Sequence, residues 1–483
     1  MIQGAARPLG RGAAPSHLFT EPGGRSAAML SWIAALAVSF IVLAAVRFTS
    51  GDPDSRVYAG IAARLASEPF ARWIAPEWWG QWGFAGPFRE HPIGIFVLPA
   101  LIGKAGYPAQ QAAYAVNGAF QVASIVLLQL LAVRLATARE ARALGWIVQL
   151  MPIAFVFRVR ANQEYAVLAA ILVALLATER SRERVAWAWL TAVGFTWALL
   201  VKGVFGFVVP VVCAVWLAAR AWDIWRDVGP GLQSGPGDVG PGLQSRPRLT
   251  RPLAPWIALA LVLLVAPALT LAYERAYVSA TGQSFLAFYI GPRLNPDAVA
   301  AGSTGRLAYN TVWYTARLAW YAFPWSLIAL TTCVVVLRGY VGQGFRLRVK
   351  LRRSAEALSA SAPSAPARPR RSSESGVGAE AVSPAENGER RSGESGLLFA
   401  VVASFVLIVL FSFSDRKADR FIFPAYYFMA AAGGVTAIRR WPAVSRVVNR
   451  LDRPWVPAVC WLSLFALRLV TGSHLPQFTF WRS

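Results

Sequence analysis

Charged residues are scarce in this chain of 483 residues, because Asp, Glu, Lys and Arg together make up 15% of it. Soluble domains carry about 25% charged residues. The hydrophobic share is 56%, which is more than a water-soluble surface and a single core require. These two values argue against an ordinary soluble globular protein and indicate a chain whose main solvent is lipid.

Acidic residues are particularly few, with 24 Asp and Glu against 48 Lys and Arg, and the formal net charge is +24. An excess of this kind suggests nucleic-acid binding, but that function needs a basic face on a folded soluble module. Here the arginines cluster in short segments between apolar runs, as the positive-inside rule predicts for cytoplasmic loops. We therefore expect no nucleic-acid partner.

Cysteine is also rare, and Cys213, Cys333 and Cys460 all lie inside apolar runs. Their wide spacing predicts neither a disulfide framework nor a zinc knuckle, so we interpret them as small apolar core residues. No small-residue cleavage site follows the first apolar run. That run is therefore interpreted as a retained membrane span and not as a removed signal peptide.

The sequence contains many long apolar runs. A spanning helix needs about 20 mostly apolar residues, since lipid cannot satisfy backbone N–H and C=O groups. The sequence predicts an all-α polytopic membrane protein with about eleven transmembrane helices. These are expected near residues 27–47, 113–133, 143–158, 163–178, 186–200, 204–219, 254–273, 312–337, 397–412, 421–437 and 455–471.

The arginine clusters predict one orientation for the whole chain. Arg7, Arg11 and Arg25 precede the first span and place the N-terminus in the cytoplasm. Strict alternation then puts the arginine-rich segments 220–253 and 338–396 inside as well. The predicted organisation is an N-terminal tail at 1–26, a transmembrane core at 27–337, an inside loop at 338–396, C-terminal helices at 397–473 and an outer tail at 474–483.

The inside and outside loops differ in composition. Residues 227–245 repeat DVGPGLQS, and residues 354–395 have almost no large apolar side chain. Such segments cannot bury enough surface to offset their chain entropy, so we expect disorder there. The outer loops 48–112 and 274–311 instead carry acids, bases and aromatic residues. Aromatic-rich stretches of this kind suit interfacial helices in the first outer loop, and function is expected on the outer face.

Three acidic residues stand at predicted helix starts on that face. Asp52 precedes Pro53, which is typical of an N-cap. Asp54 directly precedes the segment SRVYAGIAARLA, near a predicted helix N-terminus, where a carboxylate is favoured by the helix dipole. Glu164 opens the fourth span, at a depth where ionisable groups are costly and usually functional. For Asp54 a capping role remains the alternative to a functional one.

Basic residues on the outer segments run against the usual charge bias. Lys202 interrupts two apolar spans, and Arg89, His91, Lys417 and Arg420 also fall outside. A phosphate at headgroup level would compensate them, because Lys and Arg neutralise and orient phosphate oxygens. The alternative is that these side chains only snorkel at helix ends. A carboxylate beside a bound sugar phosphate would suit glycosyl transfer, with the carboxylate taking the proton of the incoming hydroxyl.

Six segments, in order, resemble the GT-C membrane glycosyltransferases, and most closely the aminoarabinose transferase and protein O-mannosyltransferase group. The segments are DPDSRVYAGIAARLA, FREHPIGIFVLPALIGKAG, RANQEYAV, LLVKGVFGFVVP, YAFPWSLIAL and FSFSDRKADRFIFPAYY. The resemblance covers roughly residues 27–440. It implies a GT-C-like helical bundle with an outer active site, a polyprenyl-phosphate-linked sugar as donor and a hydroxyl group of a lipid, glycan or protein as acceptor.

The resemblance also implies roles for single residues. Asp54, four residues before Tyr58, matches the catalytic acidic residue of the first outer loop, with a carboxylate expected to act as the base, and Glu164 matches a second acidic residue. Lys202 matches the lysine thought to meet the lipid phosphate. Further residues expected to bind substrate are Tyr58, Glu90, His91, Lys417 and Arg420. We expect an inverting transfer in the bacterial inner membrane, with the active site on the periplasmic face.

This sequence departs from the family in two ways. Ile93 stands where the family motif has a second proline, and no large soluble domain follows residue 473. Some relatives hold a metal between the glutamate of that motif and a histidine of the later outer loop. Residues 274–311 contain no histidine, so we expect no required cofactor, and a divalent metal, though possible, has no support in the sequence.

The main alternative is a transporter or flippase of lipid-linked glycan intermediates. Transporters often show inverted repeats and charges buried at the bilayer midplane. This sequence shows no similarity between its halves, and its charges fall on outer loops. That pattern favours the enzyme over the transporter, and over a non-catalytic membrane scaffold.

Overall fold

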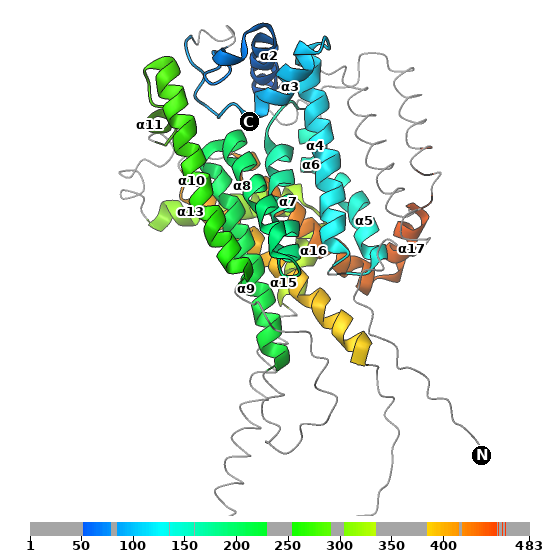
Figure 1. Cartoon of the computed structure of the whole chain (residues 1–483). Coiled ribbons are helices and arrows are strands. Elements are labelled where there is room, and N and C mark those ends of the chain that lie inside the picture. The colour runs from blue at the N-terminus through cyan, green and yellow to red at the C-terminus, as the bar shows by residue number, and fades with distance from the viewer. Residues whose placement is uncertain are drawn as a thin grey trace, which may run out of the picture.

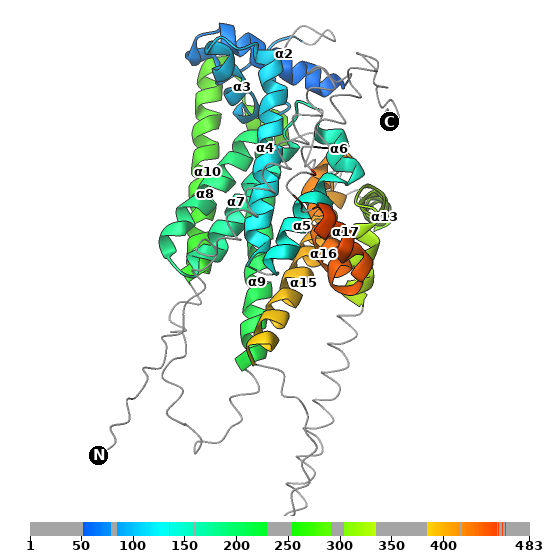
Figure 2. The ribbon, with the colours of Figure 1, turned by 90° about the vertical axis from the view of Figure 1, so that its right-hand side faces the viewer.

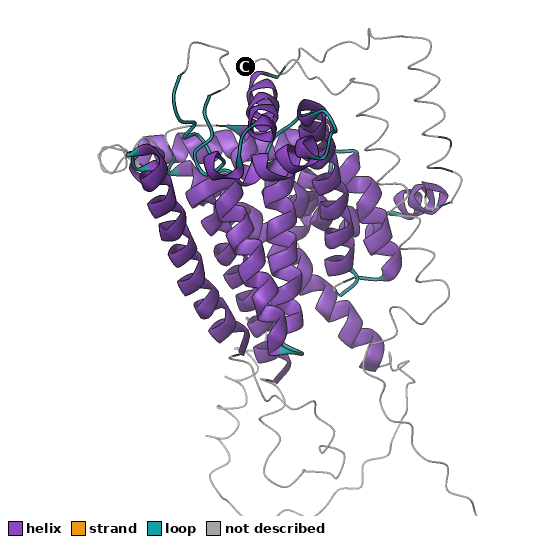
Figure 3. Cartoon of the chain, turned by 45° about the horizontal axis from the view of Figure 1, so that its top comes forward, coloured by secondary structure: helices purple, strands orange, loops and turns teal. Residues whose placement is uncertain are grey.

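The computed structural model of the chain describes residues 52–78, 85–134, 136–158, 160–228, 254–290, 304–334, 384–414 and 418–451, together with residues 453, 456 and 459. Helices form almost all of the described part (Figure 3). The described residues contain no β-strand, and their one β-bridge joins Glu77 to Pro87. The all-α class predicted from the apolar runs is therefore confirmed.

The helices follow one another with short connections. Their bounds are α2 (Pro53–Ser67), η2 (Phe70–Arg72), α3 (Gly94–Lys104), α4 (Ala109–Ala132), α5 (Ala138–Gln149), α6 (Pro152–Arg158), α7 (Glu164–Ser181), η4 (Val185–Trp187), α8 (Ala188–Lys202), η5 (Gly203–Phe207), α9 (Val208–Val228), α10 (Ala254–Thr281), α11 (Phe285–Ile290), α13 (Thr304–Tyr321), α15 (Pro384–Ser412), η8 (Asp419–Ile422), α16 (Phe423–Arg440) and α17 (Pro442–Leu451). Elements marked η are short 3₁₀ helices.

Three described segments are long and apolar enough to cross a membrane: Ala109–Ala132, Val185–Ala221 and Asp419–Arg440. A fourth is obtained if the bent pair α5 and α6 is counted as one span. Predicted span 27–47 lies outside the described residues, and so does predicted span 455–471 apart from residues 456 and 459. The expected total of about eleven spans therefore stays a prediction.

Two predicted spans are interrupted in the structure. The segment 143–158 divides into α5 and α6, whose axes differ by 65°. The segment 312–337 divides between α13 and the helix Trp325–Val334. Each break stands at a proline, Pro152 or Pro324, because proline lacks a backbone N–H and disfavours helical geometry in the residue before it.

Two helices also reach into segments for which we expected disorder. α9 continues to Val228, and α15 begins at Pro384, before the span predicted from residue 397. The polar part of α15, residues 384–396, contains three Glu and two Arg, which have high helix propensity, but also three Gly, which do not. The helix that the apolar part nucleates therefore has to carry this extension.

The first outer loop contains helices, as predicted. α2 and α3 pack against each other and against α4, and they lie across the upper end of the bundle (Figures 1 and 2). α7 lies at the centre of the bundle and packs against α4, α8 and α9. Its described side chains are buried on all sides, so the start of α7 brings Glu164 into the interior beneath α2.

Candidate active site

The start of α2 separates the two aspartates into different roles. Asp52 is the N-cap, and its carboxylate accepts hydrogen bonds from the Ser55 N–H at 3.0 Å and the Ser55 hydroxyl at 2.7 Å. It also lies 3.5 Å from a guanidinium nitrogen of Arg160. The prediction that Asp52 caps a turn is confirmed. The capping position is thereby filled, and Asp54 is left available for another function.

Asp54 lies in the first turn of α2 and forms an ion pair with Arg420 of η8. The two residues are separated by 366 positions in the chain. The side chain of Asp54 is 45% exposed and that of Arg420 is 29% exposed. A molecule at the surface of the protein therefore has access to both the carboxylate and the guanidinium group.

A second ion pair lies deeper in the bundle. The ammonium nitrogen of Lys202 is 3.1 Å from Oε1 of Glu164, and both side chains are buried. Glu164 opens α7 and Lys202 ends α8. The N-terminal end of a helix favours a negative charge and its C-terminal end a positive one. Two packed antiparallel helices thus stabilise this pair at the same level.

The two ion pairs meet at Arg420. The Lys202 ammonium also donates a hydrogen bond of 3.5 Å to the backbone carbonyl of Arg420. Among the described residues, Oε2 of Glu164 has no hydrogen-bond partner although it is buried. The site thus contains two cations, two carboxylates and one unused carboxylate oxygen.

Tyr58 forms the wall of the site on α2. It is buried and lies edge-on to His91, with ring centroids 5.7 Å apart. Burial raises the pKa of the Tyr58 phenol well above its ordinary value of 10.0. The charged residues whose fields act on this phenol are Arg420, Asp54, Glu164 and Glu90. Tyr58 therefore stays neutral near pH 7 and offers a hydroxyl group.

Glu90 and His91 occupy the second segment of the first outer loop. Nε2 of the buried His91 ring lies 3.1 Å from the amide nitrogen of Gln163, the residue before Glu164. Glu90 is partly buried and acts electrostatically on Tyr58. Both residues border the site, but neither belongs to the Asp54–Arg420 pair or to the Glu164–Lys202 pair. Lys417 lies outside the described residues.

A glycine allows this segment to approach α8. A Cβ atom on Gly94, the first residue of α3, would lie 2.6 Å from the carbonyl oxygen of Leu200. No side chain fits at that distance. The absence of a side chain at Gly94 therefore brings the Glu90–His91 segment against the end of α8, where Lys202 lies.

The sequence reasoning missed the residues that hold η8. Asp419 accepts a hydrogen bond of 2.9 Å from the Tyr321 hydroxyl, and its other oxygen lies 3.4 Å from Nε of Arg317. Tyr426 donates to the Asp419 carbonyl at 3.2 Å. These contacts fix the residue next to Arg420. In the sequence, the signal for this supporting role was Asp419, an acidic residue directly before Arg420 in the basic motif SDRKADR.

The described residues do not fit a metal centre. No group of three His, Cys, Asp or Glu side chains capable of holding an ion occurs among them. The sequence of the outer loop 274–311 contains no histidine.

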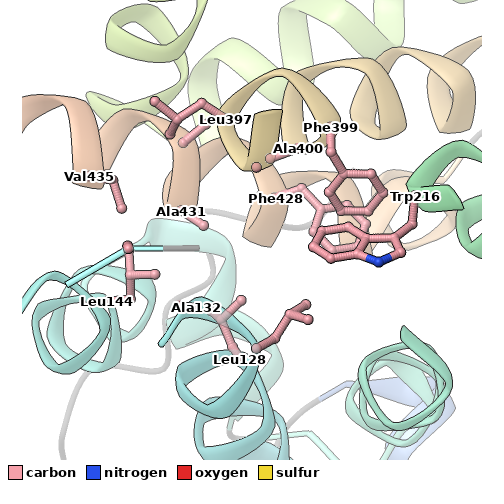
Figure 4. Close-up of a pocket in the computed structure, with 14 residues that line it drawn as sticks. Leu128, Ala132, Leu144, Trp216, Leu397, Phe399, Ala400, Phe428, Ala431 and Val435 are labelled. Carbon is pink, nitrogen blue, oxygen red and sulfur yellow. The ribbon is translucent and has the colours of Figure 1, made fainter. Parts of the chain in front are cut away.

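One cavity of ≈ 60 Å³ lies away from these residues, between α4, α5, α9, α15 and α16 (Figure 4). Its lining is apolar and includes Leu128, Leu144, Trp216, Phe399 and Phe428. A cavity without polar partners offers no group for acid–base or phosphate chemistry, so its size does not make it the active site.

Two solved structures are similar to this fold. The crystal structure of ArnT from Cupriavidus metallidurans bound to undecaprenyl phosphate shares 14% identity with a TM-score of 0.49, covering 90% of this chain and 64% of that protein. The apo structure of the same protein shares 15% identity with a TM-score of 0.48, covering 91% and 64%. The chain thus spans less than two thirds of the length of that protein.

ArnT belongs to the group that the sequence motifs resemble. No protein-family model matches the chain, and no curated protein matches it either.

Proposed function

We propose that this protein is an integral membrane glycosyltransferase of the bacterial inner membrane. It moves a sugar from a polyprenyl-phosphate-linked donor to a hydroxyl group of a lipid, glycan or protein on the outer face. The observation that carries the proposal is the meeting of Asp54, Arg420, Lys202 and Glu164 at one end of the bundle. They come from four separate elements, α2, α7, α8 and η8, and include both cations and carboxylates.

The cations suit the departing phosphate. The Lys202 ammonium donates a hydrogen bond to the backbone carbonyl of Arg420, so the two cationic residues are neighbours. In the proposed mechanism both contact the oxygens of one phosphate ester. When the bond between the anomeric carbon and the phosphate oxygen breaks, the phosphate keeps the electron pair. Positive side chains already in place stabilise that developing charge without reorganising.

The carboxylates suit the incoming hydroxyl group. Asp54 accepts its proton while the hydroxyl oxygen forms a bond to the anomeric carbon, opposite the departing phosphate. A single displacement of this kind inverts the anomeric configuration. Donor phosphate competes with Asp54 for Arg420, so binding of the donor frees the Asp54 carboxylate for this step. Glu164 holds Lys202 in place, and its free oxygen is available to a sugar hydroxyl.

The test is turnover of a polyprenyl-phosphate sugar by the purified full-length protein. Asp54→Asn should lower the rate at least about 100-fold, since general-base catalysis contributes 10²–10⁴. Asp52→Asn is the matched control, because asparagine caps helices as well as aspartate, and it should keep near wild-type activity. Equal loss in both variants would remove Asp54 from the mechanism. No turnover by the wild type, with lipid-linked sugar crossing vesicle membranes, would favour the flippase.

A further inference from the structure

The short helix α11 contacts both outer segments that carry the site. It follows α10 in the second outer loop. The guanidinium carbon of Arg89 lies 4.1 Å above the ring of Phe288. The next residue, Tyr289, donates a hydrogen bond of 2.5 Å from its hydroxyl to the carbonyl oxygen of Lys202. Two neighbouring side chains of α11 thus connect the Glu90–His91 segment to the end of α8.

Tyr289 fits closely against the turn that follows Lys202. Its side chain is fully buried and stacks on Phe285 with ring centroids 5.4 Å apart. Gly203 has a φ of +57°, and a Cβ atom there would lie 2.7 Å from the Tyr289 ring. Glycine is the residue that tolerates both this backbone conformation and this close approach.

α11 itself is anchored to α10. The carboxylate of Glu274 accepts hydrogen bonds from the Ser284 hydroxyl at 2.5 Å and from the backbone N–H of Leu286 at 2.9 Å. The second bond satisfies an N–H at the start of α11 that has no partner within the helix. The position of Tyr289 is therefore fixed from α10 as well as from α8.

We propose that Tyr289 is a positioning residue for Lys202. The carbonyl at the end of a helix lacks an intrahelical donor, and Tyr289 supplies one. This bond holds the last residue of α8 so that the Lys202 ammonium stays between Glu164 and the Arg420 carbonyl. The inference rests on the proposed function, in which Lys202 binds the donor phosphate. It adds a residue from the second outer loop to the phosphate-binding machinery.

The experiment compares two Tyr→Phe variants of the full-length protein. Tyr289→Phe keeps the ring and removes only the hydroxyl group. Tyr277→Phe is the matched control, because Tyr277 is equally buried, packs on the same Phe285, and its hydroxyl has no hydrogen-bond partner among the described residues. We expect Tyr289→Phe to weaken binding of undecaprenyl phosphate about tenfold, since it leaves a buried carbonyl without a donor. Tyr277→Phe should stay within about twofold of the wild type, and a thermal melt of each variant reports its folding.

A double-mutant cycle separates positioning from general packing. In the Lys202→Met/Glu164→Gln background, adding Tyr289→Phe should not weaken binding further if Tyr289 acts through Lys202. An undiminished affinity of Tyr289→Phe, or the same tenfold loss in that background, would overturn the positioning role alone. A wild-type protein that does not bind undecaprenyl phosphate would overturn the proposed function and this inference with it.

Discussion

At the scale of single residues, the buried pair Lys202 and Glu164 is the most constrained part of the site. Removing one partner leaves an uncompensated buried charge, which costs about 3–5 kcal/mol. We expect Lys202→Met or Glu164→Gln alone to lower thermal stability strongly, since their side chains are 5% and 0% exposed. The double variant should recover much of the stability but no transferase activity. A double variant as unstable as the single ones would show that the pair is not coupled as its 3.1 Å contact implies.

Tyr58 allows a prediction of how stability and turnover depend on pH. Burial raises the pKa of its phenol above the ordinary 10.0, so the hydroxyl keeps its proton at any pH below that value. The stability due to this shift is fully present below pH ~10 and is lost only as the pH rises further. Tyr58→Phe should therefore leave the shape of the pH–rate profile between pH 6 and 9 unchanged. A basic limb that disappears in this variant would show that the phenol titrates during catalysis.

At the scale of secondary-structure elements, the turn between α8 and η5 decides where Lys202 lies. Gly203→Ala places a methyl group against the Tyr289 ring in a backbone conformation with φ of +57°. We expect a loss of at least about 1–3 kcal/mol in stability, because non-glycine residues are strained there. Donor affinity should fall with it. Gly282→Ala is a suitable control, since Gly282 also has a positive φ of +69° but its Cβ would meet no atom within 4 Å. Equal effects of both substitutions would assign the cost to backbone strain alone.

At the scale of the whole molecule, the arginine-rich segments and the end of the bundle at which the site lies together predict that the site faces the periplasm. Gln283, between α10 and α11, should face the periplasm, and Glu183, between α7 and η4, should face the cytoplasm. In a background without native cysteines, Gln283→Cys should react with an impermeant maleimide in intact cells. Glu183→Cys should react only after permeabilisation. The reverse pattern would place the site on the cytoplasmic face. Both residues are exposed, so neither cysteine should disturb the fold.

The all-α class and the helices of the first outer loop were predictable because hydropathy and helical spacing act locally along the chain. The same local rules identified Asp52 as a cap, since its acceptor and the N–H it binds are three residues apart. Helix ends were less predictable. Breaks at Pro152 and Pro324 were not expected, because the apolar runs continue through both prolines.

The sequence by itself determined that the chain is helical and apolar and that its acids and bases follow one another in a recognisable order of motifs. Only the tertiary structure decided which charges pair. Asp54 meets Arg420 across 366 positions, and Tyr289 meets Lys202 across 87. Such partners are selected by how α2, α7, α8 and α11 pack at one end of the bundle. The physical reason is that charge and hydrogen-bond energies depend on distance in space, whereas a sequence records only distance along the chain.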